Sequence, residues 1–508
     1  MNSAELVEAL SERLQDTRLV IVANREPYIH VRKVREHRGL WARLTGRSQS
    51  VDVDWIRPAS GLVTALDPVM RACGGTWIGH GSGSGDADVT DDQGRVAVPP
   101  DKPSYTLRRV WLSPEEEQGY YYGMSNNALW PLCHIAYARP EFNEQDWRMY
   151  VRVNQRFAET VLEEIHGMRA LVFVQDYHFG LLPRFIKDAR PDAVICQFWH
   201  IPWPNPEAFR VCPWADDLLH GLLGNDLLAF HIQYHCNNFF DTVDKSLEAR
   251  VDNEQFAVWR GGRPTFVKPF PISIDPAIWA GPTKTADFVA EVRTTRRQMG
   301  LRSEKLIFGV DRLDYTKGIP DRLHAFERLL DSYPEWRGRV VMLQVGAPSR
   351  DQLAHYKELS TEVDELVGRI NLRHGTERWT PVIYRREHHD SAEIAALYRA
   401  ADVCVVSSLH DGMNLVAKEF IASRTDGRGV LVLSKFTGAA RDMEEAMLVN
   451  PYAIDEFAEA LHESLLMDPD QQERRMRALS QRVTNHTVYD WANDIIQEAC
   501  LRAESVRS

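Results

Sequence analysis

The sequence contains no long apolar run, and none of its hydrophobic stretches approaches the roughly 18 residues that a helix needs to cross a bilayer. Its first residues, Met-Asn-Ser-Ala-Glu-Leu-Val-Glu, have neither the basic segment nor the apolar segment of a signal peptide. Basic residues are in the minority, with 60 Lys and Arg against 72 Asp and Glu and a net charge of −12. Because a large nucleic-acid footprint needs a basic face, we expect a cytoplasmic protein that binds neither nucleic acid nor membrane.

Cysteine is scarce, and several short catalytic patterns are missing. The seven cysteines form no C-x-x-C pair, and an odd number fits reduced thiols better than a disulfide framework. There is no G-x-S-x-G serine elbow, and the glycine-rich stretch 79–86, expected to be a loop, lacks the lysine of a phosphate-binding loop. His231 and His235 have the spacing of a zinc pair but not the glutamate of a metalloprotease. These patterns therefore give no support for a zinc protease, a phosphate-binding loop or serine hydrolysis.

The chain does contain short β-rich apolar runs that alternate with longer amphipathic stretches. Its 508 residues, 44% of them hydrophobic, indicate a globular chain of more than one domain. Buried parallel strands are predicted at 18–23, 170–175, 193–199, 305–310, 340–345, 403–407 and 429–434. Helices are predicted between them, among others at 146–166, 320–333 and 391–400. This alternation predicts an α/β fold with doubly wound parallel sheets.

A proline-punctuated segment divides the chain. Residues 267–274 are apolar with two prolines, and two further prolines follow shortly after. We place a first domain at residues 1–275 and a second at 276–480, and we expect the helical stretch 481–508 to pack back on the first domain. The basic segment 30–47 interrupts the pattern and is expected to be a loop.

The strongest local signal is the string Asp-Arg-Leu-Asp-Tyr-Thr-Lys-Gly at 311–318, directly after the predicted strand 305–310. Side chains that follow a parallel strand lie at the carboxyl edge of the sheet, where α/β proteins bind ligands. Arg312 and Lys317 can direct two positive charges at one anion, and Gly318 allows a tight turn. A diphosphate leaving group needs such an arrangement. The alternative is a cluster of surface salt bridges.

A second string, His-Asp-Gly-Met-Asn-Leu-Val-Ala-Lys-Glu at 410–419, also follows a predicted strand. Gly412 permits a left-handed turn, and the helix expected over 414–422 offers its first N–H groups to an anion. Asp411 can accept hydrogen bonds from sugar hydroxyls, and Glu419 can accept them from both hydroxyls of a ribose. The alternatives are an N-cap aspartate and an exposed helical glutamate.

Polar residues also follow strands elsewhere. Asp176 and His200 end two apolar runs of the first half, Arg25 follows the first predicted strand, and Arg350 follows the strand at 340–345. A lone histidine is more often structural, and a lone arginine is usually solvated. Their repeated placement at strand ends favours a binding site at the edge of each sheet.

Taken together, these strings resemble the trehalose-6-phosphate synthase family of retaining GT-B glycosyltransferases. The matching segments run in family order between about residues 18 and 495, at 24–25, 60–62, 74–77, 120–121, 125–131, 176–178, 200–202, 312–318 and 411–419. The resemblance implies two Rossmann-like domains that face each other across a cleft. It implies glucosyl transfer with retention from a nucleoside-diphosphate glucose to glucose-6-phosphate, which gives α,α-trehalose 6-phosphate.

The same resemblance implies a set of site residues. Its catalytic residues would be His200, Arg312, Lys317 and Asp411. The donor would be bound by Gly61, Arg312, Lys317, Asp411, Gly412, Met413, Asn414, Leu415, Val416 and Glu419. The acceptor would be bound by Arg25, Trp77, Tyr121, Trp130, Asp176 and Arg350. Two cations would stabilise the leaving group without a metal, and a same-face displacement without a carboxylate nucleophile is implied.

Ser60, His231 and His410 depart from the common family pattern. The donor nucleotide therefore stays open among UDP, GDP and ADP, with UDP expected. Two alternative functions stay open as well: a glucosylglycerol-phosphate synthase that uses glycerol 3-phosphate, and a catalytically silent sugar-phosphate sensor. In each case the partners are small molecules, and a homo-oligomer is compatible with the sequence.

Overall fold

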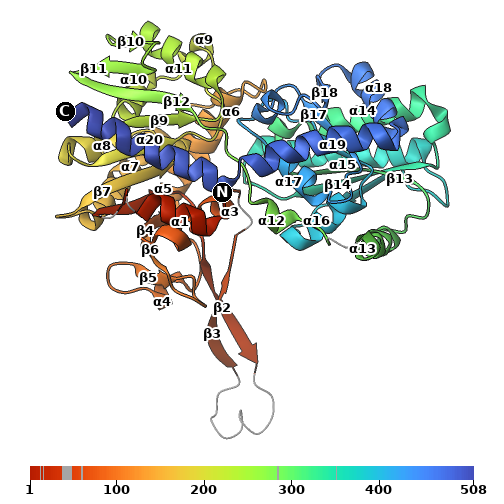
Figure 1. The fold of residues 1–508 in the computed structure, drawn as a ribbon, viewed down its shortest axis with the longest axis horizontal. Coiled ribbons are helices and arrows are strands. Elements are labelled where there is room, and N and C mark those ends of the chain that lie inside the picture. The colour runs from red at the N-terminus through yellow and green to blue at the C-terminus, as the bar shows by residue number, and fades with distance from the viewer. Residues whose placement is uncertain are drawn as a thin grey trace, which may run out of the picture.

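The computed structural model describes the chain except for residues 12, 15, 37–48, 59–60, 283–284, 351 and 508. Two sheets dominate the molecule and lie side by side with helices packed around them (Figure 1). The short apolar runs of the sequence form the strands, because a parallel sheet covered on both faces buries nearly every side chain. The predicted doubly wound α/β class is confirmed.

The larger sheet lies in the amino-terminal half and has the order β10-β11-β12-β9-β8-β7-β1-β4-β6-β5. Its strands are β1 (Thr17–Val22), β4 (Thr76–His80), β5 (Arg95–Val98), β6 (Tyr105–Val110), β7 (Arg169–Gln175), β8 (Val194–Phe198), β9 (Leu227–Phe230), β10 (Arg250–Asp252), β11 (Ala257–Arg260) and β12 (Arg263–Pro269). Pairing is parallel from β12 to β6 and antiparallel at both edges. The strand order reverses between β1 and β7, where the chain changes from building one side of the sheet to the other.

The smaller sheet is parallel throughout and has the order β15-β14-β13-β16-β17-β18. Its strands are β13 (Lys305–Arg312), β14 (Val340–Ala347), β15 (Val382–Arg385), β16 (Val403–Val406), β17 (Val430–Ser434) and β18 (Met447–Val449). This is the strand order of a dinucleotide-binding fold, and it reverses between β13 and β16. In open α/β sheets, ligands bind outside the carboxyl ends of the strands at that reversal.

Helices connect the strands of both sheets. Those of the amino-terminal half are α1 (Ser3–Ser11), α3 (Gly61–Cys73), α4 (Asp86–Val89), α5 (Pro114–Glu117), the π-helix η1 (Gln118–Leu129), α6 (Trp130–His134), α7 (Glu144–Glu164), η2 (Tyr177–Phe179), α8 (Leu182–Ala189), α9 (Pro206–Phe209), α10 (Ala215–Leu222) and α11 (Gln233–Ser246). Those that follow are α12 (Pro276–Trp279), α13 (Thr285–Gln298), η3 (Tyr315–Lys317), α14 (Ile319–Ser332), η4 (Pro334–Trp336), α15 (Ala354–His374), α16 (Ser391–Ala400), α17 (Leu415–Ser423), η5 (Gly438–Arg441), α18 (Ile454–Leu466), α19 (Pro469–Asn485) and α20 (Val488–Arg507). Within the part of the chain that the structure describes, no helix is long and apolar enough to span a bilayer.

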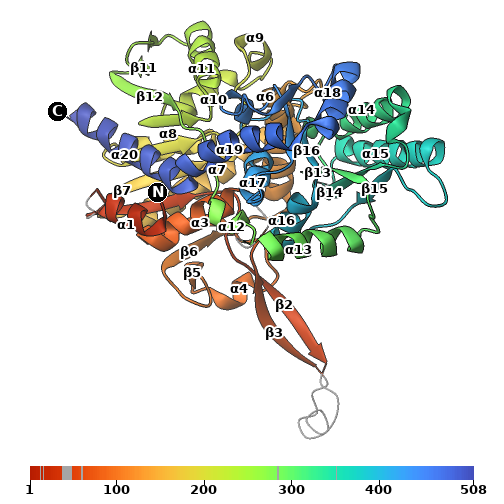
Figure 2. The same ribbon diagram turned by 45° about the vertical axis from the view of Figure 1, so that its right-hand side comes forward.

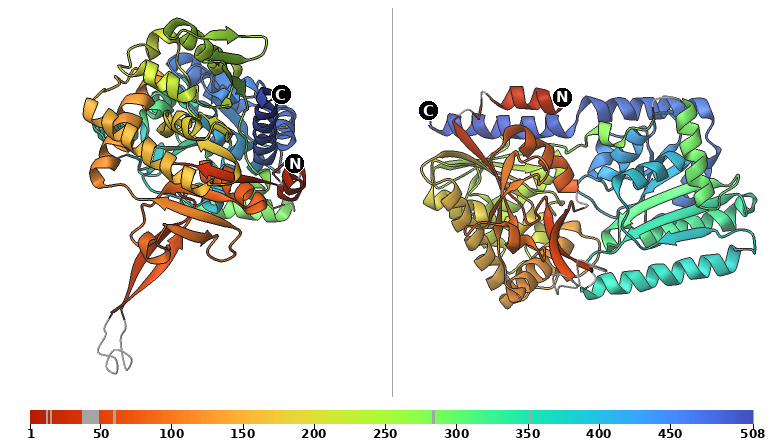
Figure 3. Two further views of the ribbon diagram at one scale, coloured as in Figure 1. Left: turned by 90° about the vertical axis from the view of Figure 1, so that its left-hand side faces the viewer. Right: turned by 90° about the horizontal axis from the view of Figure 1, so that it is seen from below.

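The chain passes between the two halves twice. It leaves the larger sheet after β12, and residue 276, where the sequence places the domain boundary, is the first residue of α12. It returns between α19 and α20, and α20 then contacts β8, β9 and β12 of the larger sheet. Figure 3 shows α20 alongside the amino-terminal helix α1. The backbone N–H of Val488 donates to the carbonyl oxygen of Ile274 (3.0 Å), so the two passages touch each other.

A hairpin of β2 (Ile29–Glu36) and β3 (Gln49–Ile56) projects from the amino-terminal half (Figure 2). The expectation of a loop over 30–47 is wrong for residues 30–36, which form β2, while 37–48 lie outside the described residues. The paired strands carry charged residues on both faces. β2 lacks the alternation that identifies a half-buried strand, whereas β3 has it in Val51-Asp52-Val53-Asp54. The stretch 79–86 is a loop only between the end of β4 at His80 and the start of α4.

Candidate active site

The carboxyl edges of the two sheets face each other and are joined by direct contacts. His410, which follows β16, donates through Nδ1 to the carbonyl oxygen of His134 at the end of α6 (2.7 Å). Arg350, which follows β14, donates through Nη2 to the hydroxyl of Tyr177 after β7 (3.2 Å). The reversal points of both sheets therefore meet at one interface between the halves of the molecule.

The loop after β13 is organised by a buried carboxylate. Asp314 accepts hydrogen bonds from the backbone N–H (3.0 Å) and the hydroxyl (2.8 Å) of Thr316. The guanidinium groups of Arg350 and Arg312 lie 3.7 and 3.9 Å from its Oδ2. Burial raises the pKa of Asp314, but Arg350 and Arg312 lower it more, so the net shift is downward and the carboxylate stays ionised. Asp314 thus holds two arginines at the edge of the sheet.

Lys317 and Asp411, both predicted to bind the donor, are paired with each other. Nζ lies 2.5 Å from Oδ2, and only 12% and 15% of the two side chains are exposed. The hydroxyl of Ser408 (3.2 Å) and the side-chain amide of Asn414 (3.3 Å) donate to the same oxygen. Burial raises the pKa of Asp411, but the charge and hydrogen bond of Lys317, together with His134 and Asn414, lower it more and hold it below its ordinary range. These contacts occupy Oδ2 of Asp411 and one N–H of Lys317, which leaves Oδ1 and two N–H donors for a ligand.

Two glycines allow the loops of the site to approach closely. Gly318 has a φ of +60°, as the predicted turn requires, and a Cβ there would lie 2.4 Å from the carbonyl oxygen of Ser407. The left-handed turn predicted at Gly412 is wrong, because the positive φ (+88°) belongs to Asn414. Glycine fits position 412 for another reason: a Cβ would lie 2.3 Å from the carbonyl oxygen of His200 in the other half.

Helix α17 directs its amino end toward this loop. Asn414 is its N-cap, and the side-chain oxygen accepts the N–H of Ala417 (3.3 Å). Met413 is buried in the core below the loop. Leu415 and Val416 are in the first turn, where backbone N–H groups have no partner within the helix. The helix thus begins where the sequence expects it, and anion binding by these N–H groups stays a prediction.

Glu419 lies on the second turn of α17 and is only partly exposed. It accepts a hydrogen bond from the hydroxyl of Tyr398 on α16 (3.0 Å). Burial raises the pKa of Glu419 to about 7. Its carboxylate is therefore close to half ionised at neutral pH, which is unusual for a group expected to accept two hydroxyl hydrogen bonds.

On the other side of the interface, Arg25 follows β1 and has an exposed side chain. Trp77, predicted to contact the acceptor, is instead fully buried, in the same cluster as Leu19 and Ile21. Its indole N–H donates to the backbone carbonyl of Arg25 (3.0 Å). Trp77 therefore supports the backbone that presents Arg25, because the alternation of strand β4 directs this side chain into the core.

Asp176 and His200 lie next to each other after β7 and β8. Asp176 has a φ of +73°, and its Oδ1 accepts the N–H groups of Tyr177 (3.0 Å) and His200 (3.2 Å). Burial raises the pKa of Asp176 to about 7 and lowers the pKa of His200 to about 3. Nε2 of His200 lies 2.9 Å from the amide oxygen of Gln175, which can only accept, so Nε2 carries the proton. His200 is therefore a neutral ring with Nδ1 left as an acceptor.

Aromatic rings and arginines complete this half. The guanidinium of Arg350 lies 4.2 Å from the ring centre of Trp130. Tyr121, in η1, stacks on His178 with a ring separation of 5.7 Å and an angle of 8°. Burial raises the pKa of Tyr121, but Arg350 and Arg25 lower it more, to about 8. Four of the six predicted acceptor residues thus lie around one electropositive region, namely Arg25, Tyr121, Trp130 and Arg350.

Some residues of the site have no signal in the sequence. Tyr356, on α15, accepts a hydrogen bond from Nη1 of Arg350 (2.6 Å), and Tyr398, on α16, donates to Glu419. Neither tyrosine follows a strand. The expectation that polar residues directly after a parallel strand belong to the site therefore could not identify them. His134 was likewise missed. Its backbone oxygen accepts from His410, and its ring packs 4.1 Å from that of Trp130.

Other expectations concern a loop and the histidines. Gly61, predicted in a loop over the donor, is the first residue of α3, and the residue before it lies outside the described part. His231 and His235 bind carbonyl oxygens, of His200 (3.0 Å) and of Trp203 (3.3 Å). Among the described residues, no group of three or more His, Cys, Asp or Glu could hold a metal ion.

Comparison with known proteins finds relatives along nearly the whole chain. The model of glycosyltransferase family 20 matches residues 17–500. The UDP-forming α,α-trehalose-phosphate synthase of Pichia angusta is 35% identical over 486 residues, which are 94% of this chain and 98% of that protein. Some relatives are longer. The UDP-forming α,α-trehalose-phosphate synthase A of Dictyostelium discoideum is 35% identical over 481 residues, 95% of this chain but 62% of that protein.

Solved structures have the same fold. The structure of trehalose-6-phosphate from E. coli bound with UDP-2-fluoro glucose superposes with a TM-score of 0.80 at 29% identity, over 95% of this chain and 99% of that one. A UDP-forming α,α-trehalose-phosphate synthase from Burkholderia xenovorans in complex with glucose-6-phosphate superposes with a TM-score of 0.81 at 30% identity, again over 95% and 99%.

Proposed function

The chain belongs to glycosyltransferase family 20, the trehalose-6-phosphate synthase family, and from that premise we propose that it transfers glucose from UDP-glucose to glucose-6-phosphate. The products are α,α-trehalose 6-phosphate and UDP. The UDP-forming relatives support the donor. The UDP-2-fluoro glucose and glucose-6-phosphate complexes of similar structures support the pair of substrates.

The observation that carries the proposal is that positively charged side chains form two clusters at the interface between the two sheets, one on each side. Arg312 and Lys317 extend from the reversal point of the smaller sheet, and Arg25 extends from that of the larger sheet. Arg350 lies between them, against Trp130 and Asp314. A reaction that joins two phosphate-bearing substrates needs a separate anion site for each, and this arrangement provides both.

On the donor side, the remaining N–H groups of Lys317 bind a phosphate oxygen, and Oδ1 of Asp411 accepts a hydroxyl of the glucose. Arg312 and the N–H groups at the start of α17 bind the remaining charge. As the glycosidic bond breaks, these fixed charges stabilise the leaving oxygen, so the proposed reaction uses no metal and no cofactor.

On the acceptor side, Arg25 and Arg350 bind the phosphate of glucose-6-phosphate, and Tyr121 and Trp130 contact its ring. The acceptor hydroxyl attacks from the face that the diphosphate leaves, and a leaving phosphate oxygen takes its proton, which gives retention. The neutral His200 accepts a hydrogen bond beside the reacting carbon rather than donating a proton. Asp176, occupied by two backbone N–H groups, holds the loop and is not a nucleophile. Closure of the two halves excludes water.

The test is nucleotide release from UDP-, GDP- and ADP-glucose, each with glucose-6-phosphate and with glycerol 3-phosphate. We expect fast release only with UDP-glucose and glucose-6-phosphate, together with a non-reducing disaccharide phosphate. Faster turnover with glycerol 3-phosphate would make the chain a glucosylglycerol-phosphate synthase.

A second result would overturn catalysis itself. If no donor released nucleotide with either acceptor while glucose-6-phosphate still bound, the chain would be a sugar-phosphate sensor. Binding of glucose-6-phosphate, measured by calorimetry in the absence of donor, separates that result from an inactive preparation.

A further inference from the structure

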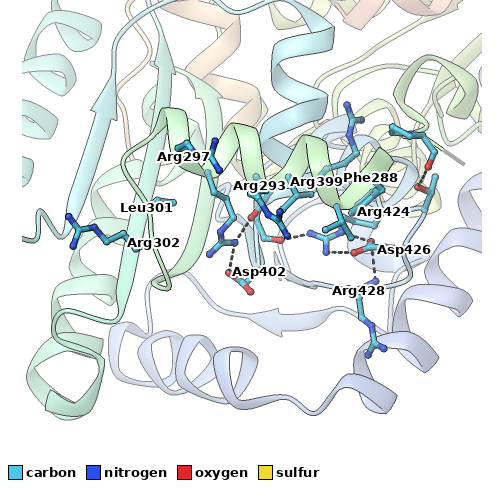
Figure 4. Close-up of a pocket in the computed structure, with 17 residues that line it drawn as sticks. Phe288, Arg293, Arg297, Leu301, Arg302, Arg399, Asp402, Arg424, Asp426 and Arg428 are labelled. Atoms are coloured by element: carbon cyan, nitrogen blue, oxygen red, sulfur yellow. Dashed lines mark hydrogen bonds and ion pairs between the residues drawn. The ribbon is translucent and has the colours of Figure 1, made fainter. Parts of the chain in front are cut away.

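A second concentration of positive charge lies away from the active site. A cavity of about 1000 Å³ opens between α13, the end of α16 and the turn at 424–428 after α17 (Figure 4). We call it the arginine cavity, because seven arginines and only two aspartates line it. One of these, Asp402, directly precedes β16 and accepts the N–H of Leu306 at the start of β13 (2.8 Å). The cavity is therefore at the amino edge of the smaller sheet, opposite the active site.

Some of these arginines hold the cavity together. Arg296 of α13 is paired with Asp402 (3.1 Å), and Arg424 is paired with Asp426 (2.9 Å). Arg399, at the end of α16, binds Glu291 of α13 (2.5 Å). The pairs of Arg296 and Arg399 join α13 to the end of α16, and Nη1 of Arg424 donates to the carbonyl oxygens of Tyr398 and Ala401. The three segments are therefore held around one space by folding alone.

The other four arginines of the cavity do not form ion pairs that hold its walls. Arg293, Arg297, Arg302 and Arg428 make no ion pair with any residue that the structure describes. Nη1 of Arg428 is buried and has no hydrogen-bond partner among the described residues. Unpaired guanidinium groups gathered in one hollow repel each other, and a buried donor without a partner is unfavourable. On a chain with a net charge of −12, this arrangement is a localised concentration of positive charge.

We propose that the arginine cavity binds a multiply phosphorylated small molecule, separately from the active site. Guanidinium groups bind phosphate oxygens in bidentate pairs, and four unpaired groups exceed the needs of a single phosphate. The volume lies within the roughly 300–1000 Å³ typical of small-molecule sites. Phe288, Val289 and Val292 of α13 form an apolar wall beside the arginines, which suits a phosphate chain that carries an apolar group such as a base.

The cavity also lies at the far ends of the two helices that hold the donor residues. Tyr398, next to Arg399 on α16, donates to Glu419, and α17, which carries Glu419, ends directly before Arg424. The arginine cavity therefore borders the ends of the elements that carry Tyr398 and Glu419.

The test is calorimetric titration of the full chain with sodium tripolyphosphate, ATP and inorganic phosphate. We compare the wild type with Arg293→Ala/Arg297→Ala, whose side chains are exposed at the cavity. Arg263→Ala/Arg378→Ala is the matched control, because it removes the same charge from exposed positions elsewhere. Lys317→Ala reports any binding at the active site. Because binding is measured without turnover, the result does not depend on the proposed reaction.

Tripolyphosphate and ATP should bind the wild type and the control alike. Lys317→Ala should keep the binding event that the cavity variant loses, and the cavity variant should lose about tenfold or more in affinity for that event. Tighter binding of ATP than of tripolyphosphate would assign the apolar wall to a nucleoside, and equal binding would assign the site to the phosphate chain alone. The proposal fails if neither probe binds, if the cavity variant binds as the wild type does, or if inorganic phosphate binds as tightly as tripolyphosphate.

Discussion

At the scale of single residues, the site keeps most of its charges paired with one another. Lys317 is bound to Asp411, and Arg350 is enclosed by Asp314, Tyr177 and Tyr356. Arg312 differs, because 39% of its side chain is exposed and its nearest carboxylate oxygen, of Asp314, is 3.9 Å away. It is therefore the more accessible of the two donor-side cations for an incoming diphosphate.

Replacing that cation should reduce the rate more than the stability. We expect Arg312→Ala to lower kcat by about 10²–10³, as for the loss of other preorganised donors to a developing negative charge. Steady-state kinetics with UDP-glucose and glucose-6-phosphate measure the change. Arg378→Ala, an exposed arginine outside the site, is the control. Activity of Arg312→Ala within about twofold of wild type would remove Arg312 from the mechanism.

The pH dependence of donor binding should show whether the ionised form of Glu419 binds the donor. Burial raises its pKa to about 7, so it is protonated below that pH and ionised above it. Only the ionised carboxylate can accept hydrogen bonds from both ribose hydroxyls. The KM for UDP-glucose should therefore fall as the pH rises through about 7. Glu419→Gln, which stays neutral, should abolish this dependence of the donor KM and leave the acceptor KM unchanged; a pH profile unaltered in the variant would contradict the assignment.

At the scale of elements, the position of the site follows from parallel strands. β13, β16, β1 and β7 are apolar runs with polar residues directly after them, and parallel strands place those residues at one edge. This is why Arg312, Lys317 and Asp411 could be found from the sequence. The strands themselves were predicted within about two residues, since a sheet buried on both faces needs continuous apolar runs.

The rest of the site depends on contacts that a linear pattern does not contain. Tyr356 and Tyr398 are helical residues that reach the site only because of how α15 and α16 pack. Trp77, which the family resemblance placed at the acceptor, is fully buried, and a strand buried on both faces gives no sign of which side chains point toward a ligand. The arginine cavity joins three segments that are far apart along the chain, and no spacing rule connects them.

The loop that precedes α17 closely approaches the loop after β8, and a substitution at Gly412 tests whether this contact matters. A Cβ on Gly412 would lie 2.3 Å from the carbonyl oxygen of His200, so Gly412→Ala should separate the two halves at the reaction site. We expect kcat/KM to fall at least about tenfold with little change in thermal stability, because the clash is between halves rather than within a core. Gly368→Ala is the control, since a Cβ there meets no atom within 4 Å. Equal activity of both variants would show that the contact is dispensable.

At the scale of the whole molecule, helix α20 joins the carboxyl terminus to the larger sheet. Trp491 is fully buried, with ring centres 5.2 Å from Phe198 and 6.0 Å from Phe173. The last element of the chain is thus part of the core beneath the acceptor side, although nearly three hundred residues separate it from β8.

Loss of that ring should destabilise the amino-terminal half. We expect Trp491→Ala to lower the free energy of unfolding by about 3–5 kcal/mol, as for other fully buried tryptophans. Denaturant titration followed by circular dichroism measures it. Leu372→Ala, at a position that is 89% exposed, should change stability by about 0.5 kcal/mol or less. Similar midpoints for the two variants would mean that α20 is not part of this core.

The two passages of the chain between the halves run against each other. The N–H of Val488 donates to the carbonyl oxygen of Ile274, the hydroxyl of Tyr489 donates to Asp275 (3.0 Å), and Nε2 of His486 donates to the carbonyl oxygen of Pro271 (3.0 Å). Two adjacent, hydrogen-bonded connections restrict the relative rotation of the halves more than a single connection would. The connection between the two halves is thus a cross-linked pair of segments rather than a single strand of chain, so a break in either segment leaves the halves still joined by the other.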